Sequence, residues 1–149
     1  MKLDHILLTS DLSPESLRPF EPVQALARRI GSRLTLLSIV LDLQVAPHGA
    51  PFAPAVSSPD LEKDVQHARL VLEEQRAALG GDLEVSIDVV GAPDVAKAIC
   101  SYAARHDVDL IAISTHGRTG LRRLALGSVA EQVIRGSEVP VLSFHRPQG

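Results

Sequence analysis

Five apolar runs of strand length recur along the chain, at residues 3–9, 34–41, 83–90, from 110 onward, and 139–144. The runs at 3–9, at 34–41 and from 110 onward have a continuously apolar centre, which is typical of parallel strands that are buried on both faces. The run at 83–90 instead alternates apolar with polar residues, so one face of the strand is expected to be exposed to solvent. This alternation predicts a strand at a sheet edge.

Between these runs, apolar residues recur three or four positions apart, as they do along one face of a helix. Such stripes predict helices over residues 23–30, 60–79, 95–102 and 128–135. Gly31 is placed to end the first helix as a C-cap. Pro19 and Pro22 predict an irregular entry to that helix, because proline has no backbone donor. Asp94 is expected in the first turn of the third helix, where the helix dipole favours a carboxylate.

Strands that alternate with helices indicate an α/β fold with right-handed crossovers, an open parallel sheet of five strands, and helices on both faces. A chain of 149 residues is long enough for one domain with one core, residues 1–149. Residues 42–59 interrupt the pattern with four prolines among Ala, Gly and Ser, and they predict a mobile loop. Such a loop either contributes to binding or has no role of its own.

Composition excludes several functional classes. The net charge is only −3 and the basic residues are scattered, so neither nucleic acid nor an anionic membrane is indicated as a partner. No apolar run reaches the length of a membrane span, and the N-terminal run is too short for a signal peptide. The single cysteine, Cys100, agrees with a reducing compartment. The protein is therefore expected to be soluble and cytoplasmic.

The stretch LIAISTHGRTGLRRLALGS, residues 110–128, contains the most informative chemistry. A buried strand opens into small and polar residues, and Gly117 and Gly120 allow main-chain amides to approach a ligand closely. Gly127 and Ser128 come directly before an apolar-periodic run, which places Ser128 as a helix cap. Exposed amides followed by the positive end of a helix predict an anion site, with phosphate as the leading candidate.

Asp11 follows the first strand, at the edge of the sheet where ligands of open parallel folds bind. Its position is equally consistent with capping a turn before Ser13 and Pro14. Position alone therefore leaves two roles open for this carboxylate, contact with a ligand and support of a turn.

At these residues the chain resembles the universal stress proteins. Nucleotide-binding members carry a glycine, two residues, a second glycine, nine residues, and then glycine with serine or threonine. Gly117, Gly127 and Ser128 fit this spacing, and the flanking THGRTGL and LGSVAEQV are similar as well. Ser114 stands where the family has its first glycine. The resemblance runs from the first strand to the last and fails only in the Pro-rich loop.

The resemblance implies a Rossmann-like sheet in the order 3-2-1-4-5 and a cytoplasmic stress-response protein that binds ATP, with Mg²⁺ held through the nucleotide. It places Asp11 at the adenine and ribose end and Ile39 at adenine through its main chain. The motif amides and Arg118 are implied at the phosphates, with the Thr115 and Ser128 hydroxyls as further donors or as groups beside Mg²⁺. The complete set of predicted nucleotide-binding residues is Thr9, Asp11, Ile39, Ser114, Thr115, His116, Gly117, Arg118, Thr119, Gly120, Gly127, Ser128, Val129 and Ala130.

The last strand, from Val139 to Phe144, predicts a homodimer, because an exposed apolar edge strand aggregates unless a partner covers it. Pro140 lacks a donor and places this strand at an edge, or itself at the strand's start. Two alternative functions remain: a nucleotide-free dimeric interaction module, motivated by Ser114, and slow ATP hydrolysis. No Walker lysine, dinucleotide fingerprint or zinc-site spacing is present, and no general base with a partner stands out, so no catalytic residue is assigned.

Overall fold

The computed structural model describes residues 2–43, 60–115 and 128–145. These residues form a parallel sheet with strand order β3-β2-β1-β4-β5, as predicted. The strands are β1 (His5–Thr9), β2 (Arg33–Leu41), β3 (Val85–Ala92), β4 (Leu110–Ser114) and β5 (Val141–Phe144). The helices are η1 (Pro14–Leu17), a 3-10 helix, and α1 (Phe20–Ile30), α2 (Leu61–Ala78), α3 (Val95–Arg105) and α4 (Ser128–Gly136).

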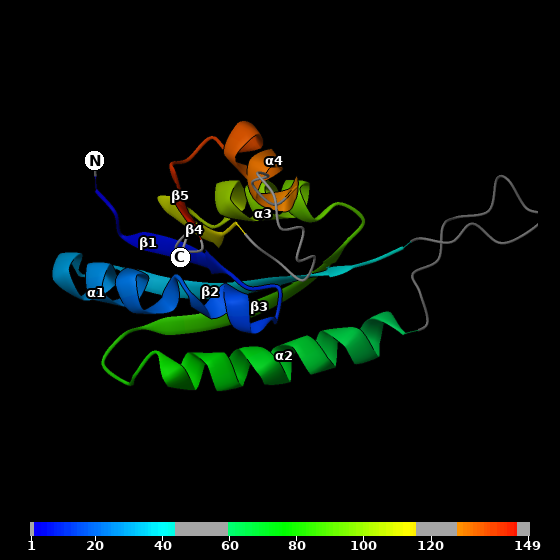
Figure 1. Cartoon of the computed structure of the whole chain (residues 1–149), viewed down its shortest axis with the longest axis horizontal. Coiled ribbons are helices and arrows are strands. Elements are labelled where there is room, and N and C mark those ends of the chain that lie inside the picture. Colours follow the sequence, from blue (N-terminus) through cyan, green and yellow to red (C-terminus); the bar gives the residue numbers. More distant parts are fainter. Residues whose placement is uncertain (1, 44–59, 116–127, 146–149) are drawn as a thin grey trace, which may run out of the picture.

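Helices cover both faces of the sheet, with α1 and α2 on one side and α3 and α4 on the other (Figure 1). Alternate residues of β1 serve the two faces. Ile6 and Leu8 pack in the cluster under α1 and α2, whereas Leu7 packs in the cluster under α3 and α4. Because both faces of a central strand are covered, its pattern is continuously apolar rather than alternating.

The sheet edges agree with the sequence pattern. The alternating strand β3 lies at one edge, and β5 lies at the other. β3 begins two residues later than expected, at Val85, and continues to Ala92. β5 begins at Val141, so Pro140 precedes the strand, where its missing donor removes no ladder bond.

The entry to α1 is irregular, as its prolines predicted. The 3-10 helix η1 comes first, and Pro19 is the N-cap residue of α1. Pro22 lies inside α1 and removes a backbone donor there, as expected, but this costs no intrahelical hydrogen bond. Pro22 is the third residue of α1, where the backbone N–H would have no intrahelical partner. Gly31 ends α1 in a left-handed conformation with φ 74°, as expected of a C-cap.

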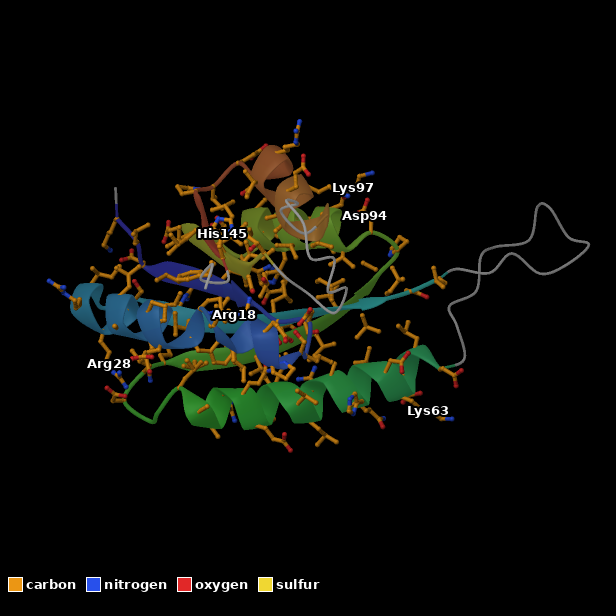
Figure 2. The ribbon with its side chains drawn as sticks, viewed as in Figure 1. Arg18, Arg28, Lys63, Asp94, Lys97 and His145 are labelled. Carbon is orange, nitrogen blue, oxygen red and sulfur yellow. The ribbon has the colours of Figure 1, made fainter. Side chains whose placement is uncertain are left out.

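Two further boundaries differ from the predictions. Asp94 is the N-cap of α3 and not part of its first turn, because its Oδ1 accepts a hydrogen bond of 3.0 Å from the Lys97 amide (Figure 2). The predicted loop at 42–59 begins later, since the Asp42 amide still donates to the Ala92 carbonyl at 2.9 Å. Residues 44–59 lie outside the described residues. Within the described ranges, no helix has the length and apolar content needed to span a bilayer.

A series of hydrogen-bonded polar side chains begins at His5, which is buried and only 4% exposed. Its Nδ1 lies 3.0 Å from the His106 carbonyl oxygen and 3.2 Å from the Arg33 guanidinium. Its Nε2 lies 2.8 Å from the Thr35 hydroxyl, which in turn lies 2.9 Å from the Ser86 hydroxyl. Burial lowers the pKa of His5, and the positive charge of Arg33 lowers it further against the opposing effect of the His106 carbonyl.

We expect this buried histidine to make stability fall in mild acid. The pKa of His5 is lower in the folded chain than its ordinary value of 6.5, so below that value the unfolded chain binds more protons. The contribution of uncharged His5 to folding stability is therefore fully present above pH 6.5, and it is lost as the pH falls through the pKa that His5 has in the folded chain. Urea unfolding across this range should show a decline for the wild-type protein and a flatter profile for His5→Gln.

His67 provides the matched control, because it is exposed on α2. His67→Gln should retain the wild-type decline. An equally steep decline in His5→Gln would show that other groups cause the acid sensitivity.

Candidate functional site

The carboxyl ends of β1, β2 and β4 lie at the same edge of the sheet. Between β1 and β4 the order in which successive strands are added to the sheet reverses. β1 leads through η1 and α1 to β2 on one side, and it pairs with β4 on the other. In open parallel sheets, ligands bind in the crevice at such a switch point. Of the predicted site residues, Thr9, Asp11, Ile39, Ser114 and Thr115 lie on these strands or directly after them.

β2 extends beyond the end of β1, so β1 does not pair with the main chain of its last residues. Thr9 pairs with Leu37, and the Ser10 amide donates to the Leu37 carbonyl at 2.8 Å, whereas β2 continues to Leu41 beside β3. In a parallel ladder, alternate residues bond to opposite neighbours, so Ile39 directs its N–H and C=O to the same side as Leu37. β1 has already ended at this level. The Ile39 side chain packs toward α3 and α4, which leaves its main chain as the part that can meet a ligand.

Asp11 forms hydrogen bonds within the turn that follows β1. Its Oδ1 accepts from the Ser13 amide at 2.9 Å and from the Ser13 hydroxyl at 2.5 Å, which is the turn-capping role. In the part of the chain that the structure describes, no donor reaches Oδ2, and the residue is exposed. The two roles are therefore compatible, because one oxygen holds the turn and the other faces solvent.

Ser114, at the end of β4, has a buried hydroxyl oxygen that finds no hydrogen-bond partner among the described residues. A buried hydroxyl without a partner costs free energy unless a ligand or water satisfies it. Thr115 behaves differently: its hydroxyl donates to the Phe144 carbonyl at 3.2 Å and lies 3.1 Å from His145 Nδ1. The Thr115 side chain is thus directed to the end of β5, and its proton is already used.

The helix α4 follows the predicted phosphate loop and returns toward the start of β5, so its first turn lies at the same edge of the sheet. Ala130 is 2% exposed, and Val129 is half-buried against the core under α3 and α4. Their side chains serve packing, and only their main-chain amides remain for a ligand. The first amides of a helix have no intrahelical acceptors and attract anions.

Several predicted residues lie outside the described residues, namely His116, Gly117, Arg118, Thr119, Gly120 and Gly127. Ser128 begins α4. Thr9 is buried at the end of β1, with its hydroxyl 3.5 Å from the Ala112 carbonyl, so it supports the strand pair below the crevice. The structure thus brings together Asp11, the Ile39 main chain and Ser114 at one edge.

Two residues of this region carry no signal in the sequence. Gln75 of α2 is only 8% exposed and contacts the turn after β1. Arg18 lies between η1 and α1, and its Nη1 is buried with no hydrogen-bond partner in the described part of the chain (Figure 2). Both are polar residues at positions of a helix or its start that ordinarily face solvent, so a single sequence does not distinguish them from surface residues.

Metal ligation by protein side chains alone has no support in residues 2–43, 60–115 and 128–145. No group of three or more His, Cys, Asp or Glu side chains there could hold an ion.

A cavity of about 400 Å³ lies at the opposite end of the strands, where α1 ends and β2 and β3 begin. The bidentate pair between Arg28 and Asp82, at 2.7 and 2.8 Å, forms part of its wall. Arg28 marks this end in Figure 2. None of the predicted site residues lines the cavity, whose lining is Ala27, Arg28, Gly31, Ser32, Arg33, Asp82, Leu83 and Glu84.

We compared the chain with known protein families, curated proteins and solved structures. The model of the universal stress protein family matches residues 2–145. Universal stress protein MJ0531 of Methanocaldococcus jannaschii is 45% identical over 53 residues, which are 36% of this chain and 31% of that protein. The aligned stretch therefore spans only about a third of this curated relative.

Solved structures share the fold along the whole chain. The structure of MJ0577, also from Methanocaldococcus jannaschii, matches with a TM-score of 0.77 and 26% identity, covering 100% of both chains. A universal stress protein in complex with cAMP matches with a TM-score of 0.64 and 20% identity, covering 97% of this chain and 98% of that one. Together with the family match over residues 2–145, this agreement shows that the chain belongs to the universal stress protein family.

Proposed function

We propose that this protein binds ATP, with Mg²⁺ carried on the nucleotide, at the carboxyl edge of the sheet, and that it acts as a nucleotide-responsive stress-resistance module in the cytoplasm. One observation carries the proposal: β2 runs past the end of β1, so the main chain of Ile39 is directed to a side where β1 no longer pairs with it. An N–H and a C=O of the peptide backbone can pair with the edge of adenine, which offers both an acceptor and a donor.

Three further features favour a nucleotide at this edge of the sheet. The outward oxygen of Asp11 suits a ribose hydroxyl, since a carboxylate accepts from it. The unpartnered hydroxyl of Ser114 suits a phosphate oxygen. The first amides of α4, together with the amides of Gly117 and Gly127, would hold the remaining phosphate charge. The relative in complex with cAMP supports an adenine nucleotide as the ligand class.

The experiment is nucleotide identification followed by titration. The purified protein is denatured, the released nucleotide is identified, and emptied protein is titrated calorimetrically with ATP, with and without Mg²⁺. We expect ATP in the released material or saturable binding in the micromolar range, about −8 kcal/mol. No released nucleotide and no binding at millimolar ATP would contradict the proposal.

The second candidate is a nucleotide-free interaction module, favoured by Ser114 in the place of the family's first glycine. The two candidates differ in one measurement. Ser114→Ala should weaken ATP binding if the hydroxyl contacts phosphate. An interaction module would show no ATP binding in either protein.

We also propose a homodimer through β5. Ala112 pairs with Leu142, and the Ile111 and Thr115 amides donate to the Pro140 and Phe144 carbonyls. The ladder alternates, so Val141 and Ser143 direct their N–H and C=O groups away from β4, toward the outer edge of the sheet. Leu142 is 39% exposed. No strand among the described residues pairs with this edge, and an edge of this kind favours pairing with a second copy.

Ser143→Pro tests the dimer, because it removes an outward N–H while leaving the bonds to β4 intact. We expect a dimer for the wild-type protein and a monomer for Ser143→Pro by light scattering at micromolar concentration. Ser143→Ala, which keeps the N–H, is the matched control and should remain dimeric. A monomeric wild-type protein would refute the dimer.

A further inference from the structure

The turn after β1 is anchored from inside the protein at Ser10, which is 6% exposed. Its hydroxyl donates to Gln75 Oε1 at 2.8 Å and accepts from the Leu12 amide at 3.0 Å. Ser16 lies 3.0 Å away and donates in turn to the Ser13 carbonyl at 2.6 Å. Through its hydroxyl, Ser10 therefore links the turn at Leu12 to Gln75, which lies 65 positions later in the sequence.

Gln75 occupies a position where an apolar residue would ordinarily pack. The buried residues of α2 are Ala68, Leu72 and Gln75, and Leu79 follows as the buried C-cap residue. This spacing is the apolar stripe that faces the sheet. A buried amide without a partner would cost free energy relative to Leu or Met, so the bond to Ser10 is what makes glutamine acceptable there.

The turn needs such support, because its backbone is unusual. Leu12 has φ 68°, a left-handed conformation that a leucine rarely adopts. The Leu12 amide is satisfied by Ser10, and the next residue, Ser13, is held by Asp11 Oδ1. The Asp11 carboxylate is thus fixed in direction by a turn whose inner anchor is Gln75.

We propose that Gln75 is a positioning residue of the nucleotide site: acting through Ser10, it holds the turn that presents Asp11 to the ligand. This inference rests on the proposed function for its ligand, an adenine nucleotide. It makes α2 a support of the site, although no residue of α2 belongs to the predicted set. A glutamine that only fills space would be replaceable by methionine without effect on the turn.

The test compares Gln75→Met, which keeps the volume and removes the acceptor, with Gln66→Met on the exposed face of the same helix. Loss of one internal hydrogen bond should weaken MgATP binding about tenfold in Gln75→Met and leave Gln66→Met unchanged. Ser10→Ala should cause a similar loss. The double variant should lose no more than the larger single loss, because both changes remove one interaction.

Gln75→Glu keeps an acceptor for Ser10 and should restore affinity above that of Gln75→Met, which a role in packing alone would not predict. Should Gln75→Met not fold, Ser10→Ala and Gln75→Glu decide the matter. Wild-type affinity in a folded Gln75→Met or in Ser10→Ala would overturn the inference.

Amide hydrogen exchange of Leu12 and Ser13 in ligand-free protein separates this inference from the proposed function. We expect faster exchange in Gln75→Met and not in Gln66→Met, since the turn loses its anchor. If the wild-type protein fails to bind ATP while exchange changes as expected, the proposed function is wrong and the positioning of the turn stands. Unchanged exchange would overturn the positioning role.

Discussion

Replacing Gly117 with aspartate is expected to weaken MgATP binding at least about a hundredfold while leaving the fold intact. Gly117 lies outside the described residues, and the resemblance to the family makes it the glycine before the nine-residue spacing. Under the proposed function, a carboxylate at this position adds a negative charge beside the phosphates. Two like charges about 4 Å apart repel by about 4 kcal/mol at an effective dielectric constant of about 20, and a hundredfold loss needs only about 2.8 kcal/mol.

The matched control is Gly81→Asp, which adds the same charge at an exposed glycine ahead of β3, at the other end of the sheet. A side chain at Gly81 would meet nothing within 4 Å. Calorimetric titration should give wild-type affinity for Gly81→Asp and almost none for Gly117→Asp, with similar melting temperatures for both. Equal affinities in the two variants would remove the phosphate site from the loop.

Leu8→Ala is expected to lower the free energy of unfolding by about 2–5 kcal/mol. Leu8, the fourth of the five residues of β1, is fully buried in the cluster that joins α1 and α2 to the sheet. Its neighbours Leu36 and Ala112 lie on paired strands, so the backbone cannot move in to fill the space that the leucine leaves. The cost therefore includes a cavity as well as lost burial.

Leu70→Ala is the matched control for this prediction, because Leu70 is 67% exposed on α2. It should change stability by no more than about 0.5 kcal/mol. Urea unfolding of the two variants gives both numbers. A loss below about 1 kcal/mol for Leu8→Ala would mean that the core under α1 and α2 repacks, contrary to the rigid pairing of β1 with both of its neighbours.

Local patterns by themselves determined the elements of this protein. Continuous apolar centres predicted the buried strands, and alternation predicted the edge position of β3, because side-chain period reports which faces are covered. Gly31 predicted the end of α1, and the prolines predicted its irregular start. The order of the strands came from the resemblance to the family, and the family match over residues 2–145 and the observed sheet confirm both. The nucleotide contacts of Asp11 and Ser114 stay predictions.

Only the tertiary structure decided which partners the polar residues have. The bond from Ser10 to Gln75 and the chain from His5 through Thr35 to Ser86 join positions far apart in sequence, so no local spacing signals them. The main chain of Ile39 is left without β1 as a partner because β2 is longer than β1, and the lengths of two paired strands are a property of the sheet. Such contacts depend on how the crossovers bring strands and helices together, and that arrangement follows from burial summed over the whole chain rather than from any one residue.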